Sequence, residues 1–132
     1  MKQYMLDTNT VSYLIKQHPA VVRRVTAVPL PSLCISAITE GELRFGLARR
    51  PEATRLHLAV REFLRRVDVL AWNSAIAGHY GQIRADMARQ GQTLSPIDLL
   101  IAAHAWGVGA VLVSNDQAFC QVTGLEVQDW TD

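Results

Sequence analysis

Short apolar runs alternate with longer segments of helical periodicity along the whole chain. In those segments apolar side chains recur three and four residues apart, as Ile76, Tyr80, Ile83 and Met87 do. Strands that alternate with helices predict a parallel sheet with helices on both faces. We therefore expect an α/β fold of three layers, with a central parallel sheet of four to five short strands. The runs of strand length are residues 4–6, 33–36, 67–70, 111–114 and 125–127.

Polar residues and helix breakers mark where the helices begin and end. Asp7-Thr8-Asn9 follows the first run as a set of capping residues, and a first helix is expected up to His18. Ser95-Pro96 provides a cap and then a proline at the first helical position. The stretch 97–106 is apolar nearly all round, which predicts a central helix. Because no repeat or linker is visible, we interpret residues 1–132 as a single domain.

Composition and motifs exclude several classes of protein. No apolar run approaches the ~20 residues that a membrane span needs, and the N-terminus does not resemble a signal peptide. Cys34 and Cys120 form no CxxC pair, so we expect buried, reduced thiols in a cytoplasmic protein. Zinc-ligand spacings, phosphate-binding glycine loops and nucleophile elbows are absent. His104 is expected to be a satisfied core residue of the central helix.

The formal net charge is only +1, but the charges are segregated along the chain. Residues 44–66 hold seven arginines and two glutamates, whereas residues 67–132 hold two arginines and seven acids. Arginine suits bidentate contacts with phosphate, although an arginine-rich helix face is often simply solvated. An acidic partner segment would fit the same stretch, so Arg44, Arg49 and Arg50 are candidate contacts to a nucleic acid or to such a partner.

Polar residues follow the predicted strands at the end where open parallel sheets bind ligands. They are Asp7, Thr8 and Asn9 after the first strand, Ser36, Thr39, Glu40 and Glu42 after the second, and Ser114, Asn115 and Asp116 after the fourth. Asp98, in the first turn of the central helix, adds a carboxylate from a further segment. We therefore expect acids from four segments to converge on one edge of the sheet.

Clustered carboxylates must be neutralised or must raise one another's pKa. Hard oxygen ligands select Mg²⁺ or Mn²⁺, which leave room for a phosphate. One or two such ions predict phosphodiester hydrolysis, in which the metal activates water and stabilises the leaving oxygen.

Each acid also has a purely structural interpretation. Asp7 fits a helix N-cap, Asp98 gains from the helix dipole, and Asp116 fits a turn. Glu42 fits a surface helix position. Glu40 lies about 200° from Glu42 around a helix, so only one of the two is expected to point inward.

Four motifs together resemble the PIN-domain ribonucleases, and in particular the VapC toxins of bacterial type II toxin–antitoxin modules. The resemblance covers essentially the whole chain, and residues 124–130 look like the enteric branch of that group. The motifs are the segments 5–9, 36–46, 96–105 and 112–116.

The resemblance implies a set of site residues by position. Its metal-holding, catalytic acids correspond to Asp7, Glu42, Asp98 and Asp116, the last at a variable place in the family. Thr8, Asn9 and Ser114 correspond to a supporting polar shell, and Glu40 is peripheral.

The resemblance also implies a function and partners. It implies Mg²⁺- or Mn²⁺-dependent endonucleolytic cleavage of RNA, a homodimer, and inhibition by a cognate VapB antitoxin whose C-terminal segment lies along a groove of the toxin. The enteric likeness implies initiator tRNA, cut in the anticodon stem-loop. Two other hypotheses remain open. One is a non-catalytic PIN-fold module that binds RNA or antitoxin. The other is a phosphatase with an aspartyl nucleophile, for which Asn9 stands where a second Asp is expected.

Overall fold

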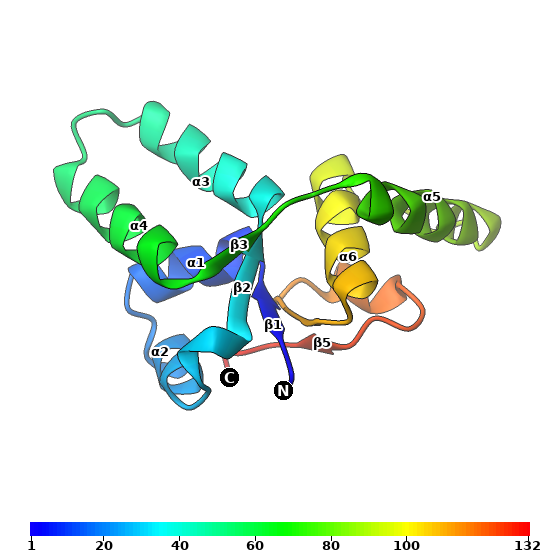
Figure 1. Cartoon of the computed structure of the whole chain (residues 1–132), viewed down its shortest axis with the longest axis horizontal. Coiled ribbons are helices and arrows are strands. Elements are labelled where there is room, and N and C mark those ends of the chain that lie inside the picture. Colours follow the sequence, from blue (N-terminus) through cyan, green and yellow to red (C-terminus); the bar gives the residue numbers. More distant parts are fainter.

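The computed structural model describes all 132 residues and contains one parallel sheet of five strands (Figure 1). The strands are β1 (Tyr4–Leu6), β2 (Leu33–Ser36), β3 (Asp68–Leu70), β4 (Val111–Val113) and β5 (Val127–Gln128). Their order across the sheet is β3-β2-β1-β4-β5, so the first strand lies at its centre. Tyr4 pairs with Leu33 of β2 on one side and with Val111 of β4 on the other.

Six α-helices and two short 3-10 helices connect the strands. The α-helices are α1 (Thr8–Ile15), α2 (Pro19–Thr26), α3 (Ala37–Ala48), α4 (Thr54–Arg66), α5 (Ser74–Arg89) and α6 (Pro96–Val108). The 3-10 helices are η1 (Leu30–Ser32) and η2 (Gln117–Gln121).

Adjacent residues of the central strands point to opposite faces of the sheet. Met5 and Leu112 pack in a hydrophobic cluster with α5 and α6, whereas Leu6 and Val113 pack in a second cluster with α1, α2, α3 and α4. Figure 1 shows α5 and α6 on one side of the strands and α1, α2 and α4 on the other. The expected three-layer α/β fold is therefore confirmed.

Side-chain caps set the starts of most helices. Asp7 accepts a hydrogen bond from the backbone of α1, Ser36 from α3, Asn73 from α5 and Ser95 from α6. The predicted starts at Asp7 and Ser95 are confirmed. Because β1 and β2 run directly into Asp7 and Ser36, the strand ends and the helix starts are the same points of the structure.

Three expectations from the sequence are wrong, and the third and fourth strands are each one residue shorter than predicted. The first helix ends at Ile15 rather than His18, because Gln17 adopts a φ of 62°. The fifth strand is Val127–Gln128 rather than 125–127, since Leu112 and Val113 of β4 pair with Val127 and Gln128. Cys120 is exposed, because the turn of η2 places its neighbour Phe119 in the core instead.

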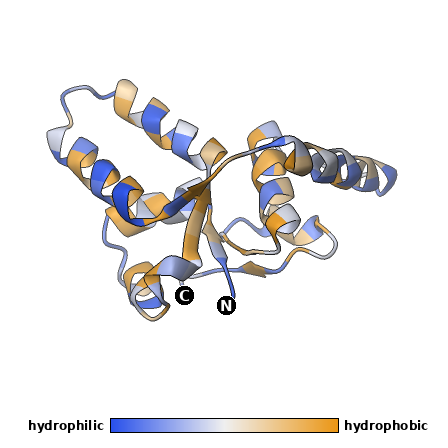
Figure 2. Ribbon diagram, in the orientation of Figure 1, coloured by the Kyte–Doolittle hydropathy of each residue, from blue (hydrophilic) through white to orange (hydrophobic).

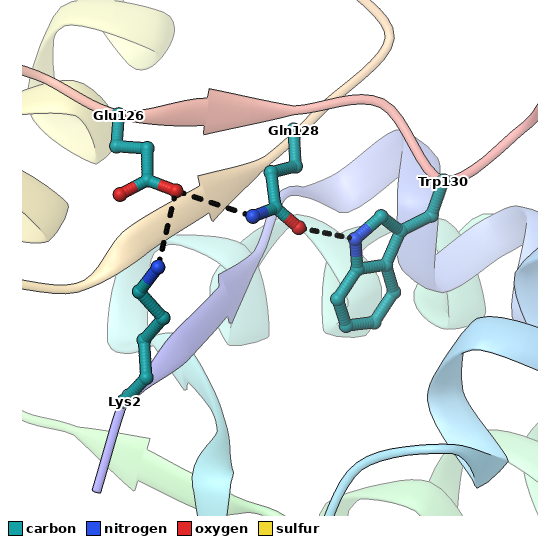
Figure 3. A network of polar contacts seen from close by, with 4 residues as sticks. All are labelled: Lys2, Glu126, Gln128 and Trp130. Carbon is teal, nitrogen blue, oxygen red and sulfur yellow. Dashed lines mark hydrogen bonds and ion pairs between the residues drawn. The ribbon is translucent and has the colours of Figure 1, made fainter.

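The C-terminal segment is tied back onto the sheet by a chain of polar contacts (Figure 3). Trp130 Nε1 donates to Gln128 Oε1 at 2.9 Å, and Gln128 Nε2 donates to Glu126 Oε2 at 3.2 Å. Glu126 also pairs with Lys2, which lies just before β1, at 3.4 Å. The indole of Trp130 is buried in the cluster on the α1–α4 face, so the last residues complete that layer.

Hydropathy follows the layers. Figure 2 shows hydrophobic colouring along β2 and strongly hydrophilic turns in α4 and at the outer end of α5. No helix of the chain has the length and hydrophobicity that crossing a membrane requires.

Candidate active site

The carboxyl ends of β2, β1 and β4 lie side by side at one edge of the sheet. Each of these strands leads into polar residues of the predicted set. Backbone contacts fix the central exit: the N–H of Asp7 donates to Val113 O at 3.1 Å, and Thr10 Oγ1 donates to the same carbonyl at 3.0 Å. The start of α1 is therefore held against the end of β4.

Asp7 is the buried carboxylate of this edge, with only 5% of its surface exposed. One oxygen, Oδ1, accepts the backbone N–H of Thr10 at 2.8 Å as the N-cap of α1. Burial raises the pKa of Asp7 above its ordinary value, and the nearby charge of Asp98 raises it further. Hydrogen bonds from Ser114 and Thr10 oppose that rise without cancelling it. Asp7 thus serves as a cap and remains an acid that lacks a compensating cation.

Glu42 reaches the same edge from the second turn of α3. Its carboxylate accepts a hydrogen bond from the hydroxyl of Thr8, the residue that follows Asp7. Glu40 instead forms an ion pair with Arg44 on the surface of α3, at 2.7 Å. The expectation that only one of these two glutamates points inward is confirmed.

Asp98 lies partly buried in the first turn of α6. Its backbone N–H donates to the capping hydroxyl of Ser95 at 3.3 Å, so its carboxylate is free of the capping role. Its charge is close enough to raise the pKa of Asp7, although the two acids lie far apart in the sequence.

Asp116 is exposed at the start of η2. Its carboxylate accepts the backbone N–H of Ala118 at 2.9 Å, so it carries out the turn role that the sequence left open. Its own N–H donates to Ser114 Oγ at 3.0 Å. Since the hydroxyl of Ser114 also bonds to Asp7, one buried serine connects the two acids.

The structure thus brings residues of all four predicted segments to the region where β1 ends. Asp98 lies beside Asp7, Glu42 is joined to this exit through Thr8, and Asp116 is joined to it through Ser114. Asn9 is exposed on α1 and makes no side-chain hydrogen bond. None of the four acids takes part in an ion pair, as the chain's ion pairs all involve other acids.

This donor set fits a partly hydrated divalent cation. No group of three or more His, Cys, Asp or Glu side chains is arranged to hold a metal ion. Magnesium-like ions, however, usually take one or two carboxylates and keep several waters. Asp7 and Asp98 can supply those two carboxylates, and a buried acid with a raised pKa gains from a nearby cation.

The predicted arginine contacts lie away from this edge. Arg44 faces Glu40 along α3, and Arg49 lies over the ring of the exposed Phe45, 4.8 Å from its centroid. Arg50 is exposed just after α3. The arginine-rich stretch therefore flanks the acidic edge and does not line it.

Sequence reasoning missed a contact behind the site. His104 is fully buried in α6, and its Nδ1 lies 2.7 Å from Ser36 Oγ at the end of β2. His104 Nε2 and the buried Thr39 Oγ1 have no hydrogen-bond partner, so the predicted satisfied core histidine is satisfied on one side only. This contact ties α6, which carries Asp98, to the start of α3, and its separation of 68 residues gives no local signal.

Comparison with known proteins identifies the family. Residues 4–125 match the family model of the PIN domain. The chain is 42% identical over 133 residues to the tRNA(fMet)-specific endonuclease VapC of Shigella flexneri, covering 99% of this chain and 100% of the relative. It is 35% identical over 131 residues to the ribonuclease VapC2 of Haemophilus influenzae, covering 98% and 99%.

Solved structures show the same architecture. The DNA-bound VapBC of Salmonella typhimurium superposes with a TM-score of 0.90 at 37% identity, over 98% of this chain and 99% of that one. VapBC2 of Rickettsia felis, bound to a promoter DNA fragment, gives 0.89 at 28% identity, over 96% and 98%. Sequence and fold agree over nearly the whole length, and the chain belongs to the PIN domain family.

Proposed function

We propose that this chain is a divalent-metal-dependent endoribonuclease, the toxin of a type II toxin–antitoxin module. The observation that carries the proposal is Asp7, a buried carboxylate at the end of the central strand that has a raised pKa and no basic partner. Asp98 adds a second negative charge beside it. A buried charge without a compensating partner costs free energy. We therefore explain the two acids as ligands of a divalent cation that also binds a phosphate of the substrate.

Mg²⁺ or Mn²⁺ is the ion we propose, held by Asp7 and Asp98 with Glu42 and Asp116 on its waters. When bound, such an ion lowers the pKa of water and stabilises the leaving oxygen of a phosphodiester. The chain's own residues supply the orientation. Thr10 N–H and the Ser114 hydroxyl fix the carboxylate of Asp7, and the hydroxyl of Thr8 fixes that of Glu42.

The substrate we propose is RNA, and initiator tRNA in particular, cut in the anticodon stem-loop. Support comes from the relatives in Shigella and Salmonella, both named tRNA(fMet)-specific endonucleases. We place the protein in the cytoplasm because tRNA is found there, and we propose that residues 1–132 act as a single domain.

A cognate VapB-type antitoxin and a second copy of this chain are the proposed partners. The related solved structures are VapBC complexes. An apolar groove between α1, α3 and α4 has Thr8 and Glu42 in its lining. A peptide in this groove would end beside the acids, where a basic side chain could neutralise them.

Sequencing of cellular RNA ends after brief expression tests the activity. The wild type should create new ends that Asp7→Asn abolishes. Asp68→Asn, which removes an exposed acid from β3, is the matched control and should leave the new ends in place. Identical ends from the wild type and Asp7→Asn would exclude the nuclease. RNA binding without binding of Mg²⁺ or Mn²⁺ would favour the alternative, a non-catalytic PIN-fold module.

A further inference from the structure

A basic groove lies between α3 and α4, and none of the four acids is part of its lining. It has a volume of about 410 Å³ and an apolar floor that includes Leu47 and Val60. Its polar lining consists of Arg44 from α3 and of His57, Arg61 and Arg65 from α4, and the three arginines give it a positive charge. We call these four residues and the space between them the arginine groove.

The arginines of this groove are available to an incoming anion. Arg61 makes no ion pair with any acid of the chain. Arg44 pairs with Glu40 and Arg65 with Glu62, but both guanidinium groups are more than 60% exposed. Ion pairs as exposed as these contribute little to stability. A phosphate group can therefore replace either glutamate at a small cost in free energy.

The arginine groove adjoins the catalytic edge through the body of α3. Leu47 and Val60 form part of its floor and also line the apolar groove that contains Thr8 and Glu42. Glu42 therefore reaches the acidic edge on one side of α3, while Arg44, two residues later, faces the arginine groove. A chain bound in the arginine groove would lie next to the apolar groove whose lining includes Glu42.

A nuclease with this acidic edge needs such a surface. The four acids repel a polyanion, and no ion pair places a cation among them. Sequence-independent affinity for nucleic acid comes from arginine and lysine contacts with phosphate. Figure 2 shows that α4 carries some of the most hydrophilic turns of the molecule, and the stretch 44–66 holds seven of the chain's thirteen basic residues.

We propose that the arginine groove binds the phosphate backbone of the RNA substrate, beyond the bond that is cut. Arg61 and Arg65 stand on successive turns of α4, and Arg44 faces them from α3. Cations spaced along a groove match a polymer with a charge on every unit better than an isolated carboxylate of a peptide. This inference rests on the proposed function, because it assumes that RNA is the substrate.

The salt dependence of RNA binding tests this inference. Unfractionated tRNA, fluorescently labelled, is titrated with Asp7→Asn protein, which does not cut it, from about 50 to about 200 mM salt. Adding Arg61→Gln should weaken binding several-fold and reduce the slope of log K against log salt by about 0.7 to 0.9. Arg61→Gln with Arg65→Gln should reduce the slope about twice as much.

Arg23→Gln in the same Asp7→Asn background is the matched control. It removes the same charge from an exposed position of α2, a helix that lies away from the carboxyl ends of the strands. This variant should leave the slope of log K against log salt unchanged. Equal losses from Arg23→Gln and Arg61→Gln would overturn the proposal, because net charge alone would then explain binding. Unchanged RNA binding by the groove variants, with weaker binding of a coexpressed antitoxin, would also overturn it and would assign the groove to the antitoxin.

A failure of the groove proposal and a failure of the proposed nuclease function give different results. If the wild type cuts no RNA but the groove variants still reduce the salt slope, the groove binds RNA and the nuclease assignment fails. If the wild type cuts RNA and the groove variants change neither the slope nor KM, the groove proposal fails alone. In a cutting enzyme with the groove in use, Arg61→Gln should raise KM several-fold with kcat nearly unchanged.

Discussion

At the scale of single residues, short polar side chains organise the acids. Thr8 holds Glu42, and Ser114 contacts both Asp7 and Asp116. The acids come from elements far apart in the sequence, so neighbouring hydroxyls decide which carboxylate points to the edge. Glu40 shows the contrast, because it has an arginine on its own helix and turns toward it.

Glu42→Gln and Glu40→Gln form a matched pair on α3. Glu42→Gln should lower the rate of RNA cleavage about 100-fold or more, because it removes a charge that positions the metal and its waters. Glu40→Gln breaks only an exposed ion pair and should change the rate less than about threefold. Single-turnover cleavage of initiator tRNA at saturating Mg²⁺ measures both, and equal rates for the two variants would remove Glu42 from the site.

Asp7→Asn should stabilise the metal-free protein. Burial raises the pKa of Asp7, so the folded state holds this proton more tightly than the unfolded chain does. Its contribution to stability therefore falls as the pH rises through the folded pKa, and the full cost is present at neutral pH. Asn keeps the capping oxygen for Thr10 and carries no charge.

Thermal unfolding at neutral pH without metal should thus give a Tm for Asp7→Asn a few degrees above that of the wild type. The difference should shrink as the pH falls toward the acid range. Added Mg²⁺ or Mn²⁺ should raise the Tm of the wild type only. A variant less stable than the wild type at every pH would show that the carboxylate is structural rather than a ligand.

At the scale of elements, the starts of helices were predictable and their mutual contacts were not. The residue types of Asp7 and Ser95, and the residues directly after them, predict helix starts. The structure has a side-chain cap at both positions. The end of α1 was missed because a left-handed residue, Gln17, has no strong signal in its side chain. The contact between Ser36 and His104 joins elements 68 residues apart, and only the fold brings them together.

The burial of His104 makes stability depend on pH. Burial lowers the pKa of His104 below 6.5, so the unfolded chain binds this proton more tightly than the folded protein. The contribution of His104 to stability is therefore fully present above pH 6.5 and is lost as the pH falls below that value. The loss should loosen α6, and with it Asp98, from the start of α3.

His104→Gln tests this link between elements. The variant should lose about 1 to 2 kcal/mol at pH 8, because Ser36 loses its partner in the core. It should also lose less additional stability than the wild type between pH 8 and about pH 5.5. Urea unfolding at both pH values measures the two differences. Parallel losses of stability in the two proteins would assign the pH dependence to other groups.

At the scale of the whole molecule, the last residues join the two ends of the chain. Trp130 packs against Tyr4 of β1, with ring centroids 5.3 Å apart, and the guanidinium of Arg24 on α2 lies 5.7 Å from the indole. The contacts of Figure 3 add Lys2 to the same tie. The layer that supports α1, and therefore Asp7, is thus closed by a residue from the C-terminal end of the chain.

Trp130→Ala should destabilise the protein by about 3 to 5 kcal/mol, because it empties a large buried position in the cluster on the α1–α4 face. Trp130→Phe keeps an aromatic ring against Tyr4 and loses the bond to Gln128, so its cost should be clearly smaller. Gln128→Ala removes the same hydrogen bond from the other side and should cost about 1 kcal/mol. Gln128 ends β5, but only its backbone carbonyl contacts Ser114, and the side chains of Gln128 and Trp130 bond to none of the four acids. RNA cleavage by the folded fraction of each variant should therefore match that of the wild type. Urea unfolding with cleavage assays well below each Tm tests both parts, and a loss of cleavage by stable Trp130→Phe would mean that the C-terminal tie acts on the site.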